Sequence, residues 1–308
     1  MAAACCHPSW PCRAGSLSGV GRVTPPPVPS PIVSDPSFDP TTVPVKPAAT
    51  VMLLRDADAG MEVFMLRRTM NAVFAGGMYV FPGGRVDDAD HADELEPICD
   101  GLDDPTASGR LQIERGGLAY WVAAIRECFE EAGVLLARHE DDGGDVVRFD
   151  DPDVATRFER ERAAVYAGER ALADLCAEEH LLLTAGGIHY VSHWITPVGE
   201  RRRFDTRFFL ARAPQAQEPL HDDSETIESL WVRPQEALDR FHSGDLGMFP
   251  PTVRNLESLL GHDSADDALA AASEVGPPPT ILPKLRVDDE GKVLGIAEPG
   301  DPGYDDLP

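Results

Sequence analysis

Apolar and polar residues follow one another along the chain in patterns that predict interleaved strands and helices. The predicted strands cover residues 48–54, 62–66, 78–81, 189–195, 203–211 and 228–232. The predicted helices cover residues 153–180, with a break near Gly168, 234–241 and 251–260. Few simple strand–helix–strand crossovers are seen in this order. We therefore expect an α+β fold, in which helices cover both faces of a mixed sheet in an α/β/α sandwich.

The composition changes along the chain and predicts three regions. Residues 1–45 are rich in Ser, Pro and Val without amphipathic periodicity, which is typical of a disordered tail. Residues 46–262 hold the strands and helices of the expected domain. Residues 263–308 are an expected C-terminal extension, in which segments 281–287 and 292–296 resemble a β-hairpin at the edge of the domain or folded over it.

One amphipathic helix is predicted to carry three acidic residues close together. Glu127, Glu130 and Glu131 lie at i, i+3 and i+4, within an arc of about 100°. Apolar residues such as Val122, Ile125 and Phe129 occupy the opposite face. Carboxylates clustered in this way suit Mg²⁺ or Mn²⁺. The alternative is a solvated helix face with an Arg126–Glu130 pair at i, i+4.

A glycine loop upstream and a glycine after the helix complete a longer motif. Gly83 and Gly84 follow an apolar stretch that ends in Pro82, Asp90 lies six residues after Gly84, and Gly133 interrupts the helix. Together with Arg126-Glu127-x-x-Glu130-Glu131, these residues resemble the Nudix box. The resemblance implies a Nudix-type α/β/α sandwich, with metal ligands at Glu127, Glu130 and Glu131 and support from Arg126, Gly83, Gly84, Asp90 and Gly133.

The motif departs from the family pattern in two ways. Asp90 stands where the family usually has Glu, and residues 91–117 form an insertion between the two halves of the box. Such an insertion, together with Phe81-Pro82-Gly83-Gly84, resembles the coenzyme A diphosphatase branch, although Val73 occupies the position of an arginine in that branch's signature. Because the insertion lies beside the expected metal site, we expect a lid or specificity element.

The resemblance implies an enzyme that hydrolyses a pyrophosphate bond with the help of a divalent metal. The substrate would be a nucleoside diphosphate linked to another moiety, such as coenzyme A or an acyl derivative. The alternative is a Nudix-fold module that binds a nucleotide without cleaving it. Such modules usually lose box carboxylates, whereas this chain retains Glu127, Glu130 and Glu131, which favours the enzyme.

Four residues outside the box are further candidates for the site. Arg203 and Arg207 lie on one face of a predicted strand, and their guanidinium groups suit phosphate oxygens. A strand face balanced by Asp205 is the alternative. Glu225 and Glu228 precede Trp231 and could supply one more acid to the site, as Nudix enzymes often bring one from a loop before a late strand. An acidic surface loop is the alternative for these two.

The overall charge and the cysteines narrow the classes of partner. The formal charge is −26, from 27 basic and 53 acidic residues, and no basic stripe suits nucleic acid. No apolar run approaches the roughly 18 residues that span a membrane. The six cysteines form no CxxC pair, which is typical of reduced thiols in a cytoplasmic protein. We therefore expect a small-molecule substrate, and a homodimer remains open.

Overall fold

The computed structural model describes residues 39–70, 76–140, 146–219, 225–288 and 292–307. Most of the predicted tail and Val73 therefore lie outside the described residues. Residues 39–45 of that tail form a short 3-10 helix, η1 (Pro40–Thr42), and the first residue of a long strand, β1 (Val45–Ala57).

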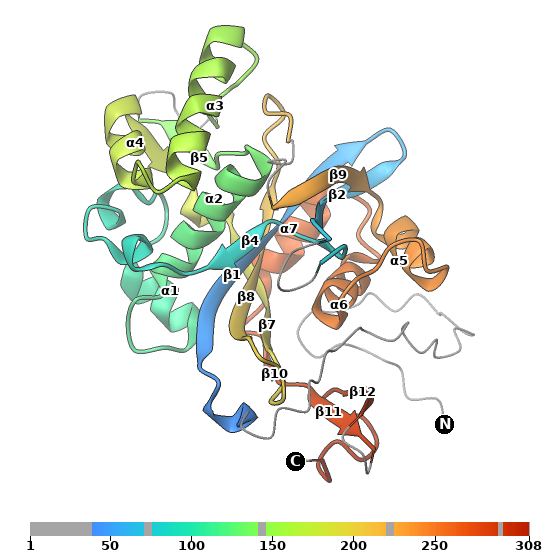
Figure 1. Cartoon of the computed structure of the whole chain (residues 1–308). Coiled ribbons are helices and arrows are strands. Elements are labelled where there is room, and N and C mark those ends of the chain that lie inside the picture. Colours follow the sequence, from blue (N-terminus) through green and yellow to red (C-terminus); the bar gives the residue numbers. More distant parts are fainter. Residues whose placement is uncertain (1–38, 71–75, 141–145, 220–224, 289–291, 308) are drawn as a thin grey trace.

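A mixed eight-stranded sheet forms the centre of the fold (Figure 1). Its strands besides β1 are β2 (Gly60–Arg68), β3 (Tyr79–Val80), β4 (Gly83–Arg85), β7 (His189–Ile195), β8 (Arg203–Arg212), β9 (Thr226–Val232) and β10 (Thr280–Ile281). The main order is β10-β7-β8-β1-β2-β3, while β4 pairs with β1 and β9 pairs with β2. The β1–β8 and β10–β7 pairs are parallel and the others are antiparallel.

One face of the sheet packs against helix α2 (Leu118–Ala132). Alternate residues of β1, including Ala49, Val51 and Leu53, point into this core and are fully buried. The helix meets them with Trp121, Ile125 and Phe129, which are also buried. The apolar stripe predicted for this helix therefore forms the core contact, and this packing fixes the direction of the opposite, acidic face.

The other face of the sheet is covered by three helices from the C-terminal half of the chain. These are α5 (Pro234–His242), α6 (Pro250–Leu259) and α7 (Ala265–Glu274). Two more helices, α3 (Pro152–Tyr166) and α4 (Leu172–Glu179), flank α2 together with a small sheet of β5 (Ala137–His139) and β6 (Leu181–Leu183) (Figure 1). The α+β class and the mixed-sheet sandwich expected from the sequence are confirmed.

The insertion between the two halves of the box packs into the domain. It contains the last residue of η2 (Asp88–His91), then η3 (Glu96–Ile98) and helix α1 (Asp104–Leu111). Between η3 and α1, Gly101 lies against Gly186 of η4 (Ala185–Gly187). Its apolar side chains Leu95, Leu102 and Leu111 are buried in the same core as α2. These side chains anchor the insertion in the core, and its role as a lid or specificity element stays a prediction.

The insertion also fixes the beginning of the box helix. The carboxylate of Asp104 accepts hydrogen bonds from the backbone N–H groups of Gly116 and Leu118, each at 3.0 Å. These groups lie at the start of α2, where N–H groups have no partner within the helix. The insertion thus supplies the cap of α2.

The C-terminal residues contribute to the main layers as well as to a hairpin. In α7, Ala265, Ala268 and Ala272 are buried against the sheet, and β10 pairs with β7 at its edge. The last two strands, β11 (Lys284–Val287) and β12 (Val293–Ala297), pair antiparallel as a separate two-stranded sheet. In the described part of the chain, every helix is too short or too polar to cross a bilayer.

Candidate active site

The acidic face of α2 lies over the short strand β4, and both ends of the helix are held in place. Gly133 terminates α2 with φ at +68°, a conformation that glycine adopts without strain. Arg162 of α3 donates hydrogen bonds to the carbonyl oxygens of Glu130 and Glu131, each at 2.9 Å. These carbonyls belong to the last turn of α2, so a cation caps the negative end of its dipole.

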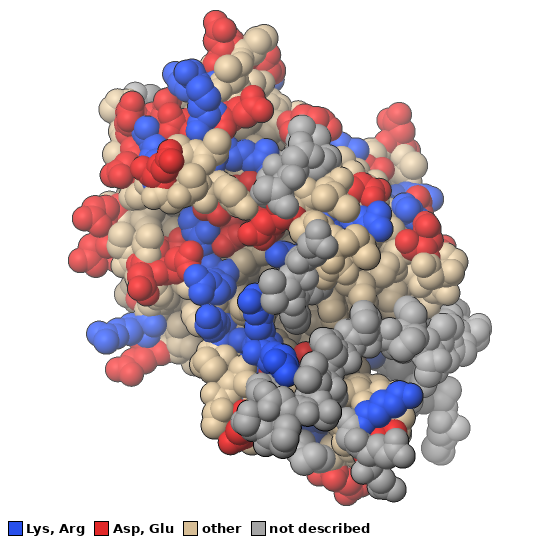
Figure 2. Space-filling model, viewed as in Figure 1, with Lys and Arg blue, Asp and Glu red and all other residues tan. Residues whose placement is uncertain are grey.

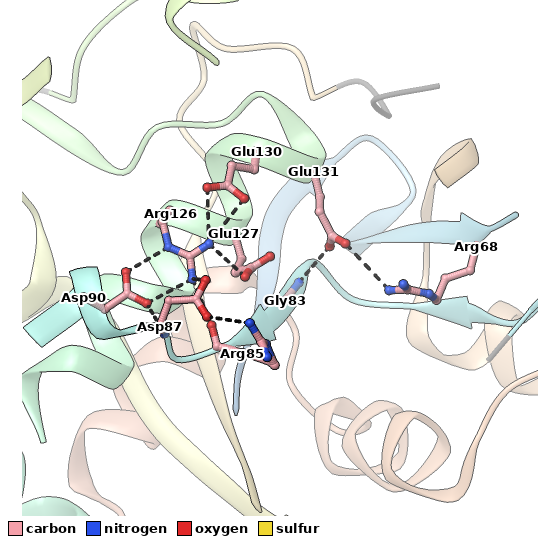
Figure 3. A network of polar contacts seen from close by, with 9 residues as sticks. All are labelled: Arg68, Gly83, Arg85, Asp87, Asp90, Arg126, Glu127, Glu130 and Glu131. Atoms are coloured by element: carbon pink, nitrogen blue, oxygen red, sulfur yellow. Dashed lines mark hydrogen bonds and ion pairs between the residues drawn. The ribbon is translucent and has the colours of Figure 1, made fainter. Parts of the chain in front are cut away.

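Arg126 is the centre of an ion-pair network that joins the two halves of the motif (Figure 3). Its Nε and Nη2 donate to Asp90 at 2.8 and 3.0 Å, and its Nη2 also donates to the carbonyl oxygen of Arg85 at 2.9 Å. Its Nη1 donates to Glu127 at 2.9 Å and to Glu130 at 3.2 Å. The guanidinium is only 9% exposed. A single buried arginine thus brings Asp90 to the helix despite the insertion between them.

Glu131 faces the glycine loop and a second arginine (Figure 3). Its carboxylate accepts the backbone N–H of Gly83 at 2.9 Å and lies 3.7 Å from Nη1 of Arg68. Arg68 also pairs with Glu225 at 3.0 Å. The chain therefore brings Glu225 beside the box carboxylates through Arg68, although Glu225 lies 94 positions after Glu131 in the sequence.

Glu228 lies on the other face of the sheet. It pairs with Arg67 at 3.3 Å, and Arg67 is the neighbour of Arg68 on β2. Successive residues of a strand point to opposite faces. Of the two late acids predicted from the sequence, the structure brings Glu225 to the box and places Glu228 away from it.

Burial and mutual repulsion set the electrostatics of the cluster. Burial raises the pKa of Glu131, and the charge of Glu127 raises it further, while Arg68 opposes the rise. Burial likewise raises the pKa of Glu127, and Arg126 opposes that shift. The pKa of Glu130 is raised by burial in the same way. The two arginines therefore neutralise these carboxylates only in part, and the cluster favours a further cation.

The donor set fits a divalent cation such as Mg²⁺ or Mn²⁺. Carboxylate oxygens are the ligands that these hard cations prefer. Within the described ranges, no three His, Cys, Asp or Glu side chains converge on one point. The reason is visible in the contacts, since Arg126 draws Glu127 and Glu130 while Gly83 and Arg68 draw Glu131. A cation would compete with these arginine contacts for the same oxygens.

The two strand arginines predicted as candidates lie on the same face of the sheet as the box. Arg207 on β8 is paired in register with Ala49 on β1, which is paired in turn with Gly84 on β4. Arg203 is four residues away along β8. Among the described residues, neither arginine forms an ion pair or hydrogen bond with a box carboxylate. These two arginines therefore lie beside the cluster rather than within it.

Arg68 and Arg162 were not identified as site residues from the sequence. The alternation of β2 could have indicated Arg68, because this residue follows Phe64 and Leu66 on the face of the strand that packs towards α2. Arg162 has none, since it lies in a run of charged residues that is typical of a solvated helix. Only the packing of α3 against the end of α2 identifies it.

Gly84 leaves room for a box carboxylate, and this predicts a large effect of one methyl group. A Cβ at Gly84 would lie 2.3–2.5 Å from the carboxylate atoms of Glu127. We expect Gly84→Ala to displace Glu127 and to reduce turnover by about tenfold or more, because a small misplacement at a reacting centre is costly. The melting temperature should change little, since the far end of a flexible side chain can move.

Gly109 provides the control for this substitution. It lies in α1, and a Cβ there would meet nothing within 4 Å. Gly109→Ala should leave turnover unchanged and leave stability equal or slightly higher. Equal turnover of the Gly84→Ala variant and the wild type would show that turnover does not require the Glu127 carboxylate to lie against residue 84.

Comparisons with known proteins agree with this geometry. The sequence model of the NUDT19 Nudix domain matches residues 102–259, just over half of the chain. The chain is 29% identical over 241 residues to a protein of Gallus gallus named acyl-coenzyme A diphosphatase NUDT19, covering 67% of this chain and 63% of that protein. The Homo sapiens protein of the same name is 28% identical over 240 residues, with 68% and 63% covered. The chain thus spans less than two thirds of the length of these relatives.

A solved structure shows the same architecture. The crystal structure of a NUDIX hydrolase from Alicyclobacillus acidocaldarius superposes with a TM-score of 0.61 at 28% identity, covering 77% of this chain and all of that one. The match of the domain model begins within the insertion and therefore does not include the first half of the box. The structure joins the two halves through the contacts of Arg126 with Asp90 and of Glu131 with Gly83. The chain belongs to the Nudix hydrolase family, in the group that the NUDT19 Nudix domain defines.

Proposed function

We propose that this protein is a divalent-metal-dependent pyrophosphohydrolase that acts on coenzyme A or its acyl derivatives. The observation that carries the proposal is the set of three carboxylates, Glu127, Glu130 and Glu131, which one helix turn presents beside the Gly83–Gly84 loop. Membership of the Nudix hydrolase family supports the reaction class. The names of the curated relatives support the choice of coenzyme A.

Mg²⁺ or Mn²⁺, held by Glu127, Glu130 and Glu131, would neutralise phosphate charge and favour attack by water at phosphorus. Arg126 keeps Glu127 and Glu130 on the same side of the helix by donating to both. Gly83 fixes one oxygen of Glu131 through its backbone N–H. Without a Cβ at Gly84, the strand can approach Glu127 closely. The chain's own residues therefore hold the carboxylates beside the Gly83–Gly84 loop before substrate binds.

Glu225 is the acid outside the box that is best placed to take part. It reaches the cluster through Arg68, which contacts both Glu225 and Glu131. A carboxylate in this position could orient the attacking water or accept its proton. Glu228 faces the other side of the sheet and has no such role in the proposal.

The proposal is tested by the substrates that the purified protein cleaves. With Mg²⁺ or Mn²⁺ present, it should cleave coenzyme A and acyl-coenzyme A faster than ADP-ribose, dinucleotides or dinucleoside polyphosphates. Mass spectrometry of the products identifies the bond that is broken. A higher kcat/KM for ADP-ribose or a dinucleotide than for coenzyme A would contradict the proposed substrate while leaving the reaction class intact.

A further inference from the structure

Beside the box carboxylates, the sheet carries a row of paired residues that ends at Gly84. Thr280, His193, Arg207, Ala49 and Gly84 are paired in register across five strands, from β10 to β4. Residues paired in this way point to the same face of the sheet. With strands about 4.8 Å apart, the Cα atom of Arg207 lies about 10 Å from that of Gly84, and the carboxylate of Glu127 lies against Gly84. A substituent of a substrate bound at the box carboxylates could therefore reach Arg207.

Arg207 is a buried cation whose hydrogen-bonding capacity is largely unused. It is only 5% exposed, and among the described residues its Nε and Nη1 have no hydrogen-bond partner. In the same part of the chain, its one ion pair joins Nη1 to Oδ1 of Asp205 at 3.2 Å. That same oxygen lies 2.6 Å from Nε2 of His193. A buried guanidinium with unmet N–H groups is costly unless a ligand completes its contacts.

The residues around Asp205 fix that carboxylate in place and leave little of it for Arg207. His193 bridges Asp205 and Thr280, with its Nδ1 2.8 Å from the hydroxyl of Thr280. The position of Asp205 therefore depends on two strands besides its own. This arrangement holds the carboxylate towards the imidazole, and no other anion of the described residues meets the Arg207 guanidinium.

A second arginine adds to the positive charge on this face. Arg203, four residues before Arg207 on β8, is 9% exposed and donates through Nε to the carbonyl oxygen of Thr196 at 3.0 Å. Among the described residues, no ion pair joins it to a carboxylate. Of the two buried guanidiniums, only that of Arg207 pairs with Asp205 among the described residues. On the surface, Lys and Arg side chains gather below an acidic cluster (Figure 2).

Aromatic rings form the walls of this position. The guanidinium carbon of Arg207 lies 5.7 Å from the ring centroid of Tyr120, at the start of α2, and 6.0 Å from that of Tyr190, on β7. These rings leave the edges of the guanidinium as the groups that can meet an anion. Guanidinium edges bind the oxygens of a phosphate in pairs.

We propose that Arg207, assisted by Arg203, binds a phosphate monoester of the substrate that lies outside the pyrophosphate. This inference rests on the proposed function, because coenzyme A carries such a group on the ribose of its adenosine diphosphate moiety. The separation of Arg207 from the box carboxylates places the group beside the bond to be cleaved. The protein would then select coenzyme A over dephospho-coenzyme A, which has the same pyrophosphate without that phosphate.

Binding of two product-like nucleotides tests the inference without requiring turnover. Calorimetric titration of the wild-type protein in Mg²⁺ should show adenosine 3′,5′-bisphosphate binding about tenfold or more tightly than adenosine 5′-monophosphate, as expected for a charge-assisted contact. Arg207→Gln should remove this difference, and Arg207→Lys should restore part of it. In cleavage assays, Arg207→Gln should lower kcat/KM for coenzyme A towards its value for dephospho-coenzyme A.

Arg212→Gln is the matched control, because Arg212 lies on the same strand but pairs with Asp56 and Asp266 at 2.9 and 2.6 Å. It should leave the preference intact. Equal affinity of the wild type for the two nucleotides would overturn the inference, even if the Arg207 variants fail to fold. Equal weakening of both nucleotides by Arg207→Gln would also overturn it, and would assign Arg207 to the pyrophosphate. Cleavage of coenzyme A and dephospho-coenzyme A at equal rates would leave the proposed function standing.

Discussion

Glu131→Gln should lower turnover by about 10²- to 10³-fold, the size of effect expected when one preorganised charge at a reacting centre is lost. The amide keeps the size of the side chain and can still accept the N–H of Gly83. Its neutrality also removes repulsion with Glu127, which together with burial raises the pKa of Glu131. The melting temperature of the metal-free protein should therefore be equal to or higher than that of the wild type. Steady-state kinetics and thermal melts check both parts.

Glu228→Gln is the control for this prediction. Glu228 lies within β9, the strand that Glu225 immediately precedes, but pairs with Arg67 on the other face of the sheet. We expect its turnover to stay within about threefold of the wild type, a change too small to indicate a lost transition-state contact. A Glu131→Gln variant that melts much lower while turning over at the wild-type rate would assign Glu131 a structural role instead.

Arg126→Met should lower the free energy of unfolding by about 3–5 kcal/mol, because removing one partner of a buried ion pair leaves the other charges uncompensated. Three carboxylates accept hydrogen bonds from this guanidinium, namely those of Asp90, Glu127 and Glu130. The contact with Asp90 also holds η2, which leads into the insertion, against α2. The loss of stability therefore extends beyond the site. Urea unfolding at neutral pH measures the change.

An exposed arginine shows what a non-critical ion pair contributes. Arg148 pairs with Asp150 at 2.8 Å, but its side chain is 64% exposed. Arg148→Met should change the free energy of unfolding by less than about 1 kcal/mol, as is usual for surface pairs. If Arg126→Met were as stable as this control, the network would orient the carboxylates without stabilising the fold.

The elements that alternate or repeat clearly could be predicted from the sequence. The strands expected at 189–195 and 203–211 correspond to β7 (His189–Ile195) and β8 (Arg203–Arg212), and both expected C-terminal helices are present as α5 and α6. Periodicity works here because one face of each element is buried. Helix α7 was not predicted, because its buried residues are alanines, which give only a weak apolar pattern.

The candidate site could be predicted where its residues lie in one helix turn. The spacing of Glu127, Glu130 and Glu131 places them on one face whatever the rest of the chain does. The contact of Arg68 with Glu131, and through Arg68 the approach of Glu225, depends on how distant strands pair. Likewise, only the packing shows that the insertion is part of the core and caps α2 through Asp104.

Cleavage of coenzyme A in the presence and absence of a divalent metal tests the central claim most directly. With Mg²⁺ or Mn²⁺, mass spectrometry should detect phosphopantetheine and adenosine 3′,5′-bisphosphate in equal amounts. Chelation with EDTA should abolish both products, and Glu131→Gln should nearly abolish them with the metal restored. Cleavage that survives both EDTA and Glu131→Gln, or no cleavage of coenzyme A with either metal, would contradict the account.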